Sequence, residues 1–297
     1  MTDRIRIALQ KSGRLAEDSL ALLKSCGLHV ENRREQLFCS IKELPIDLLL
    51  VRDDDIPEFV SNDICDLGIV GENVFLEKKL EKKADGGAEF SAVLLDRLGF
   101  SNCRLVIAIP EKGRIQTLAD LAGTTIATTY PHLLQEFLRS QHIEAKSLVM
   151  TGSVEVAPRL KIAESICDIV ASGATLIANN LRELTVVLRS EALLIRSAQE
   201  LSAKKEAILH RLLTRMRGVQ RAQDSKYIML NAPRHALSAI TQLLPGCDSP
   251  TVIDLNRNDM VAVHAVCKEA VFWDTMEKLQ QVGASAILVL PIEKMAL

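Results

Sequence analysis

Residues 166–176 read Ile-Cys-Asp-Ile-Val-Ala-Ser-Gly-Ala-Thr-Leu. The apolar run Ile166–Val170 predicts a buried strand, and the small residues after it predict a tight turn. An apolar stretch compatible with a helix begins at Leu176. A strand that leads through a short glycine turn into a helix is the repeating unit of α/β proteins, so this stretch indicates that fold class.

The same turn has the composition of a phosphate-binding loop. Backbone N–H groups before a helix are unpaired, and the helix dipole adds positive charge there. The hydroxyls of Ser172 and Thr175 add donors, Gly173 permits close approach of an anion, and Asp168 is suited to sugar hydroxyls. The alternative is a capped strand–helix turn, because Ser and Thr are common helix caps. The candidate set is Asp168, Ala171, Ser172, Gly173, Ala174 and Thr175.

Short apolar runs alternate with amphipathic stretches up to about residue 180, which predicts parallel sheets with helices on their faces. The expected strands are Ile5–Leu9, Ile46–Val51, Leu67–Val70, Val93–Leu95, Leu105–Ile109, Thr125–Thr128, Ser147–Met150 and Ile166–Val170. The expected helices are Leu15–Ser25, Ile56–Asn62, Leu133–Gln141 and Val154–Glu164. Two α/β lobes joined by two crossings would enclose a cleft, which is the usual place for a ligand. This is the architecture of type II periplasmic binding proteins.

The predicted domains follow from these patterns. Residues 1–98 with 181–224 form a first, discontinuous lobe, and residues 99–180 form a second lobe that carries the phosphate-binding loop. The run Leu184–Ile195 is expected to be β structure that returns to the first lobe, and Leu201–Gln223 is expected to be a long helix. The arginines on that helix resemble a nucleic-acid stripe, but charge runs are usually solvated helix faces.

Residues 225–297 have a different pattern. The predicted order βαββαβ is that of a ferredoxin-like split unit, with turns at 245–248 and 256–259. The expected elements are Tyr227–Asn231, Ala236–Leu244, Thr251–Leu255, Val261–Cys267, Ala270–Val282 and Ala286–Leu290. This stretch contains no concentrated set of catalytic residues, which favours a sensing or assembly role.

Composition excludes several classes of function. The 297-residue chain has a net charge of −2 and is 48% hydrophobic, so neither a nucleic-acid-coating surface nor a membrane span is expected. Its start, Met1–Arg4, leads straight into an expected strand, and no signal peptide is predicted. The seven scattered cysteines indicate reduced thiols and a cytoplasmic protein. Cys167 is expected to be a buried strand residue rather than a nucleophile.

Further candidate residues follow other strand ends. Lys11, Gly13 and Arg14 follow the first strand, where the two cations would bind phosphate or would only be surface charges. Among Asp53–Asp55, a Mg²⁺ site and a helix cap are both open; capping is preferred for Asp55, while Arg52 and Asp53 remain cleft candidates.

Two more segments end expected strands. Gly71 and Glu72 follow a strand in a glycine turn, where an adenine or ribose could approach closely or the chain could simply turn. Tyr130 is one of few aromatic residues and could stack on a base. His132 is expected to be a capping or surface residue rather than a general base.

Seven blocks of the chain occur in the order of a known family. The blocks are Gln10–Leu15, Val51–Pro57, Asp66–Asn73, Ala127–Leu133, Gly152–Arg159, Cys167–Asp168 with Ser172–Leu176, and Leu288–Met295. Together they resemble the long form of the ATP phosphoribosyltransferase family over essentially the whole chain. The sequence departs from the family pattern at Lys161 and Asn180, where glycine is expected, and at Ile177, where glutamate is expected.

The resemblance implies a reaction and its ligands. The family transfers a phosphoribosyl group from phosphoribosyl diphosphate to N1 of ATP, with Mg²⁺ on the substrate pyrophosphate and protein ligands to that ion unassigned. Histidine is the implied inhibitor, bound by residues 225–297, and dimers and hexamers are the implied assemblies. The implied ATP set is Lys11, Gly13, Arg14, Arg52, Asp53, Gly71, Glu72 and Tyr130, with Glu155 and Asp168 as positioning or electrostatic groups.

A rival interpretation belongs to another class of protein. A cytoplasmic solute-binding or sensor module with the same two lobes would explain the cleft and the C-terminal domain without chemistry. The sequence offers no helix-turn-helix pattern for DNA binding. Pyrophosphate release from ATP and phosphoribosyl diphosphate separates the two interpretations.

Overall fold

The computed structural model describes residues 3–30, 37–86, 90–223, 225–244, 250–268 and 272–295. The turn predicted at 245–248 lies outside these residues. The chain divides into two compact units. One contains Met1–Ala21 and Leu28–Ile208, and the other contains Leu22–Gly27 and Leu209–Leu297.

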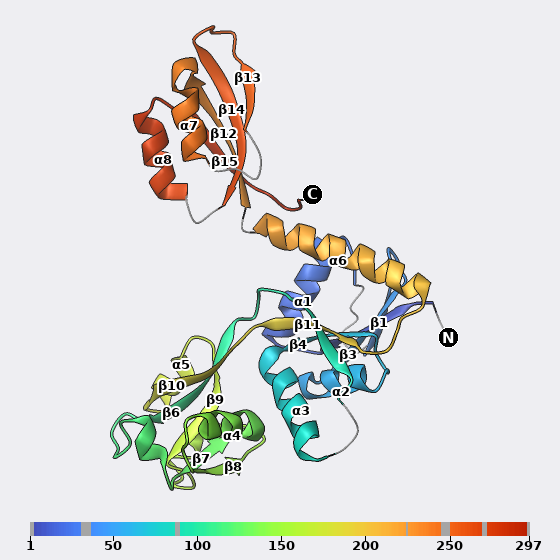
Figure 1. Cartoon of the computed structure of the whole chain (residues 1–297), viewed down its shortest axis with the longest axis vertical. Helices are drawn as coiled ribbons and strands as arrows, with labels where there is room; N and C mark the ends of the chain where they lie inside the picture. The colour runs from blue at the N-terminus through green and yellow to red at the C-terminus, as the bar shows by residue number, and fades with distance from the viewer. Residues whose placement is uncertain are drawn as a thin grey trace. The chain divides into compact units, whose positions relative to one another are not determined.

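The first lobe is built on a six-stranded sheet of order β2-β3-β1-β4-β11-β5. Its strands are β1 (Ile5–Gln10), β2 (Phe38–Ile41), β3 (Ile46–Val51), β4 (Leu67–Gly71), β5 (Ala92–Arg97) and β11 (Ala192–Ser197). The central strands β3, β1 and β4 run parallel. The associated helices are α1 (Arg14–Ser25), α2 (Ile56–Ser61) and α3 (Glu72–Ala84) (Figure 1). Strand β2 and helix α3 were not predicted.

A glycine on β4 permits the close packing of α2. A Cβ atom at Gly68 would lie 2.7 Å from Cγ2 of Ile56 and 3.0 Å from Cγ2 of Val60. Real Cβ atoms do not approach this closely, so any side chain at this position would push the helix off the sheet. The glycine therefore fixes the depth at which α2 packs on β4.

The second lobe is a five-stranded sheet of order β10-β6-β9-β7-β8. Its strands are β6 (Cys103–Pro110), β7 (Thr125–Thr128), β8 (Lys146–Val149), β9 (Ser165–Val170) and β10 (Leu181–Ser190). Strand β10 pairs antiparallel with β6 from Leu181 to Ser190, although the predicted boundary at residue 181 assigned it to the first lobe. That assignment was wrong, because the chain returns to the first sheet only at Ala192: the run Leu184–Ile195, expected as one β segment, is divided between two strands at Glu191.

One predicted helix of the second lobe is also wrong. The lobe has helices α4 (Pro131–Ser140) and α5 (Ala174–Ala178), but Val154–Glu164 forms only the 3₁₀ turn η3 (Val154–Val156) followed by turns. Pro158 cannot donate a backbone hydrogen bond, and Lys161 has a φ of 56°, which interrupts any right-handed helix. Lys161 and Asn180 (φ 55°) are the two positions where the family pattern has glycine, and both adopt the left-handed backbone that glycine favours.

The second unit confirms the predicted ferredoxin-like order. Its elements after α6 (Ala203–Gln223) are β12 (Ser225–Pro233), α7 (Leu237–Leu243), β13 (Thr251–Asp254), β14 (Met260–Lys268), α8 (Phe272–Gln281) and β15 (Ser285–Pro291). The strands form an antiparallel sheet of order β13-β14-β12-β15, with α7 and α8 on one side (Figure 1). Ile228, Leu230, Ile240 and Leu279 form part of the core beneath these helices. No helix among the described residues is long and apolar enough to cross a bilayer.

Candidate active site

The predicted phosphate-binding loop connects β9 to α5. Strand β9 ends at Val170, Gly173 has a φ of 85°, and α5 begins at Ala174. Ala171, Ser172, Ala174 and Thr175 are exposed. The amide of Ile177 donates to the carbonyl of Gly173, so the amides of residues 174–176 precede the first hydrogen bond within the helix. The loop therefore presents backbone donors and two hydroxyls on an open surface.

An acidic residue lies just before this loop in an unfavourable environment for charge. Asp168 is half-buried, and its Oδ1 accepts a hydrogen bond from the amide of Ile169 at 2.8 Å. Burial raises the pKa of Asp168 above its ordinary value, and the nearby carboxylate of Glu155 raises it further. Glu155 of η3 is thus close enough to Asp168 of β9 for its charge to act on it. A bound cation or hydroxyl donor would stabilise the ionised form of Asp168.

Tyr130 connects this acidic pair to the first lobe. Its hydroxyl accepts a hydrogen bond from Nδ2 of Asn73 at 2.9 Å. Burial raises the pKa of Tyr130, and the charges of Asp168, Asp53 and Asp54, which belong to both lobes, raise it further. The Tyr130 ring packs on the apolar clusters of both lobes. Stacking of this ring on a base stays a prediction.

The three consecutive acids form a 3₁₀ turn, η1 (Asp53–Asp55), that leads into α2. Asp55 occupies the cap position of α2, but its side chain makes no capping hydrogen bond, which corrects the predicted capping role. Its backbone is already helical (φ −83°, ψ −23°), whereas a capping side chain needs extended backbone. Burial raises the pKa of Asp54, and neighbouring Asp53 adds to the effect.

The predicted cations lie at the carboxyl edge of the first sheet. The pairing of Gln10 with Val51 brings the next residues, Lys11 and Arg52, side by side at that edge, and both side chains are exposed. Arg14 is also exposed and donates to the carbonyl of Asn102 at 3.2 Å. Gly13 precedes Arg14 with a φ of 95° and permits the turn into α1.

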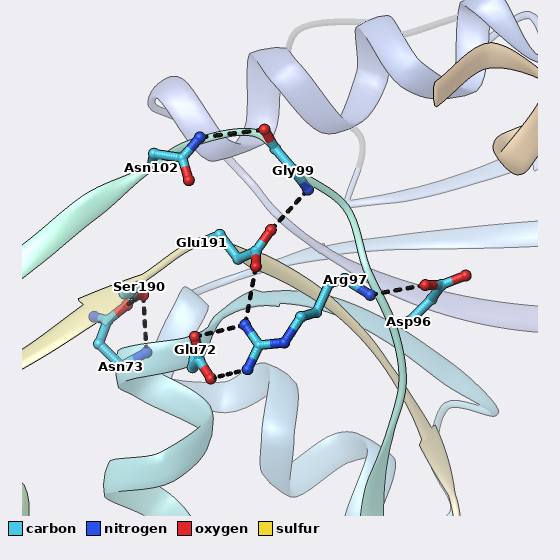
Figure 2. Close-up of polar contacts among 8 residues, drawn as sticks. All are labelled: Glu72, Asn73, Asp96, Arg97, Gly99, Asn102, Ser190 and Glu191. Atoms are coloured by element: carbon cyan, nitrogen blue, oxygen red, sulfur yellow. Dashed lines mark hydrogen bonds and ion pairs between the residues drawn. The ribbon is translucent and has the colours of Figure 1, made fainter. Parts of the chain in front are cut away.

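Glu72 occupies a different kind of environment. It is 8% exposed, and the guanidinium of Arg97 binds both of its carboxylate oxygens (Figure 2). Arg97 also donates to Glu191 at 2.9 Å, and Glu191 accepts a hydrogen bond from the amide of Gly99 at 2.9 Å. The structure therefore places Glu72 in a network at the two crossings between the lobes. Gly71 is the residue before it, at the start of α3.

His132 neither caps a helix nor stands as a free surface group. Its Nδ1 lies 2.9 Å from Oε1 of Glu77. Glu77 also accepts hydrogen bonds from the amides of His132 and Leu133, at 2.9 and 2.8 Å. Glu77 of the first lobe is therefore the residue that caps α4 of the second lobe, and His132 is its neighbour. Cys167 is buried as predicted, and burial raises the pKa of its thiol.

Four residues in and around this site were not predicted from the sequence, and each bonds to a partner that is distant along the chain. Asn73, Glu77, Arg97 and Arg104 each bond to a segment at least 20 residues away. No local motif marks such contacts, because they depend on how separate elements meet. Arg104 is the one that reaches the loop itself, through the carbonyl of Ala171 at 3.3 Å.

The described residues provide no protein cage for a metal ion. Among them, no group of three or more His, Cys, Asp or Glu side chains is placed to hold one. The carboxylates of Asp168 and Glu155 are hard oxygen ligands of the kind that Mg²⁺ takes when it also binds substrate phosphates. The donor set therefore suits a magnesium ion carried by a phosphorylated substrate.

Comparison with known proteins defines the class. The ATP phosphoribosyltransferase family matches residues 52–218, and the family described as HisG, C-terminal domain, matches residues 222–294. A curated ATP phosphoribosyltransferase from Maricaulis maris is 52% identical over 99% of each chain. A solved structure, the ATP phosphoribosyl transferase (HisG:HisZ) complex from Thermotoga maritima, is 26% identical. It has a TM-score of 0.58, with 72% of this chain and 98% of that chain covered.

The fold is that of a two-lobed α/β protein with a C-terminal α/β domain, and the family match defines it as a transferase. The chain belongs to the ATP phosphoribosyltransferase family. It is therefore a pentosyltransferase of the first step of histidine biosynthesis.

Proposed function

We propose that the chain transfers the 5-phosphoribosyl group of phosphoribosyl diphosphate to N1 of ATP in the cytoplasm. A bond forms between adenine N1, which supplies the electron pair, and the anomeric carbon. The bond from that carbon to pyrophosphate breaks, and pyrophosphate leaves with its electrons. The ring nitrogen is already nucleophilic, so the reaction needs alignment and charge stabilisation rather than an activated side chain. The membership in the family supports this reaction.

We assign the 5-phosphate of phosphoribosyl diphosphate to the loop of residues 171–175. Its exposed amides and hydroxyls suit a phosphate, and Asp168 beside it suits the ribose hydroxyls. We assign the polyphosphate of ATP to Lys11, Arg14 and Arg52 at the edge of the first sheet. Gly13, Asp53, Gly71 and Tyr130 remain further candidates around ATP, whereas the carboxylate of Glu72 is already bound by Arg97.

We propose that Mg²⁺ binds together with the substrate, on its pyrophosphate. When bound to pyrophosphate, Mg²⁺ neutralises charge on the leaving group. Asp168 and Glu155 are the carboxylates that would face the ion, because Asp168 lies just before the loop and the charge of Glu155 acts on it. Their part is to hold the ribose and to balance charge at the anomeric carbon.

The open, donor-rich loop after β9 is the observation that carries the proposal. Pyrophosphate release on mixing ATP, phosphoribosyl diphosphate and Mg²⁺ tests the reaction. The Thr175→Ala variant should raise the KM for phosphoribosyl diphosphate about ten- to a hundredfold, the cost of one hydrogen bond to a charged group. Thr214→Ala is the matched control, since that exposed hydroxyl bonds to His210 of its own helix. An unchanged KM in Thr175→Ala would contradict the assignment of the loop.

We also propose that residues 225–297 bind histidine and that copies of this domain pair in a homo-oligomer. The sheet face opposite α7 and α8 supports this, because Leu288 and Leu290 are exposed there. Across the sheet on that face, the Tyr227 hydroxyl and Nδ1 of His264 lie 2.7 Å apart. Such a face offers apolar area for a second copy and polar groups for an amino acid.

Histidine inhibition tests the role of this domain. The full chain should be inhibited by histidine, and a chain that ends at Gln223 should not respond. Size measurement must accompany the assay, because loss of the domain should also reduce the oligomer. Persistent inhibition of an active, shortened chain would place the histidine site elsewhere.

A further inference from the structure

Arg104 lies where the second lobe begins and where the phosphate-binding loop starts. It is the second residue of β6, directly after the first crossing between the lobes. The strand register places it opposite Val170, the last residue of β9, and opposite Arg189 of β10. Nothing in the local sequence around Arg104 marks a ligand site.

The Arg104 side chain connects its own strand, β6, to β10 and to the loop that follows β9. Its Nε donates to Oε2 of Glu183 at 3.1 Å, and its Nη2 donates to the other oxygen of the same carboxylate. Its Nη1 donates to the carbonyl of Ala171, the first residue of the loop, at 3.3 Å. Glu183 belongs to β10 and pairs there with β6, so the bidentate ion pair fixes the plane of the guanidinium between the strands.

The other hydrogen bonds of the loop come from the loop itself and from α5 and its end: the amide of Ile177 donates to the carbonyl of Gly173 at 3.2 Å, and Nδ2 of Asn179 donates to the carbonyl of Thr175 at 2.9 Å. Within the loop, the amide of Ala174 makes a long contact of 3.4 Å with Oγ of Ser172. Among the described residues, Arg104 is the side chain from another strand that hydrogen-bonds to residues 171–175. This hydrogen bond is therefore the contact through which a side chain of another strand can restrain the first loop carbonyl.

We infer that Arg104, held by Glu183, is a positioning residue for the phosphate-binding loop. The inference rests on the proposed role of that loop. Because the charge of Arg104 is compensated by the Glu183 carboxylate, its main effect is on geometry rather than on attraction of the anion. A lysine, which keeps the charge but lacks the planar fork, will not replace it.

The test compares Arg104→Lys with Arg182→Lys by kinetics and by hydrogen exchange. Arg182 is one residue from Glu183 on β10, and its side chain bonds to Gln116, away from the loop. Arg104→Lys should raise the KM for phosphoribosyl diphosphate about tenfold, the effect of one charge-assisted hydrogen bond, and leave the KM for ATP within about twofold. Amide exchange in residues 171–178 should accelerate. Arg182→Lys should change none of these quantities.

Three outcomes overturn the inference. They are a wild-type KM for phosphoribosyl diphosphate in Arg104→Lys, an equal rise in both KM values, and unchanged exchange in residues 171–178. Thr175→Ala, measured beside these variants, separates this failure from failure of the proposed function. If Thr175→Ala weakens phosphoribosyl diphosphate and Arg104→Lys does not, only the positioning role fails. If neither variant affects that substrate, the loop is not its site.

Discussion

The crossings between the lobes and the phosphate-binding loop are both polar, but they differ in how their polar groups are satisfied. At the crossings, Arg97 binds Glu72 and Glu191, and Ser190 both donates to and accepts from Asn73 (Figure 2). At the loop, the hydroxyl of Thr175 and the amides near it face an exposed surface.

This difference distinguishes polar groups that stabilise the fold from polar groups that are available to bind a ligand. A buried polar group that already has its partners contributes to stability and has little capacity left for a ligand. A group that lacks partners, or a carboxylate such as Asp168 whose pKa is raised by burial, is poised for one. Changes at the crossings should therefore act on stability, and changes at the loop should act on substrate binding.

Replacement of Gly173 by valine should give the largest effect. The glycine φ of 85° strains any β-branched residue, but a Cβ there meets no atom within 4 Å, so the chain can still fold. At the proposed site, the added side chain would occupy space that the phosphate needs and would keep the phosphate from the backbone donors. We expect affinity for phosphoribosyl diphosphate to fall by about a hundredfold or more, equivalent to two or more lost hydrogen bonds. Isothermal titration calorimetry measures it.

Gly123→Val is the control for backbone strain. Gly123 has a φ of 73°, also with no atom within 4 Å of its Cβ, in a turn of the same lobe between η2 (Leu118–Leu121) and β7. The two variants should lose similar stability, and only Gly173→Val should lose the substrate. If folded Gly173→Val protein bound phosphoribosyl diphosphate with near-normal affinity, the loop would not be the part of the molecule that binds this substrate.

Replacement of Arg97 by methionine tests the structural role of the polar network at the crossings. It leaves the largely buried Glu72 without its counter-charge, which should lower the free energy of unfolding by about 2 kcal/mol. This value lies between those of buried and exposed pairs, because half of the Arg97 side chain is exposed. Adding Glu72→Gln should restore part of the loss. Denaturant unfolding gives the stability, and the KM for ATP should stay within about twofold. If Arg97→Met kept normal stability and raised the KM for ATP, Glu72 would instead belong to the substrate site.

The Asp168→Asn variant should be more stable than wild type at neutral pH and less active. Burial raises the pKa of Asp168 in the folded state, so the ionised carboxylate destabilises the fold at neutral pH, and the penalty disappears once acid protonates it. Asparagine keeps the Oδ1 acceptor for the amide of Ile169. The variant should therefore melt higher than wild type at pH 8 and equally in acid, while kcat/KM for phosphoribosyl diphosphate falls about tenfold. A lower melting temperature at pH 8 would show that the charge has a structural partner.

The strands were predictable because each is an apolar run between turn residues. The exceptions have physical causes. Strand β2 (Phe38–Ile41) has only two buried residues, and α3 has a charge-rich sequence with little apolar periodicity. The run Val154–Glu164 has helical spacing, but Pro158 and the left-handed Lys161 break it. Apolar runs also do not show which sheet a strand joins, which is why β10 was placed in the wrong lobe.

The site was predictable only where it is local. The loop of residues 171–175 is contiguous, so its small residues predict its conformation, and Gly173 adopts the positive φ that such a turn requires. The partners of Glu72 and His132 come from other elements. Spacing along the chain does not encode such contacts, and the residue that reaches the loop, Arg104, is 67 positions away from Ala171.

The smallest expected effect concerns the protonation of Asp168. The carboxylate of Glu155 raises the pKa of Asp168, so Glu155→Gln should lower it. If binding of the ribose requires ionised Asp168, the acid limb of the kcat/KM profile for phosphoribosyl diphosphate should then move to lower pH. Glu164→Gln is the control, since that exposed acid of the same lobe lies near Arg114 and is not among the charges that act on Asp168. A limb that stays in place in Glu155→Gln would mean that another group sets it.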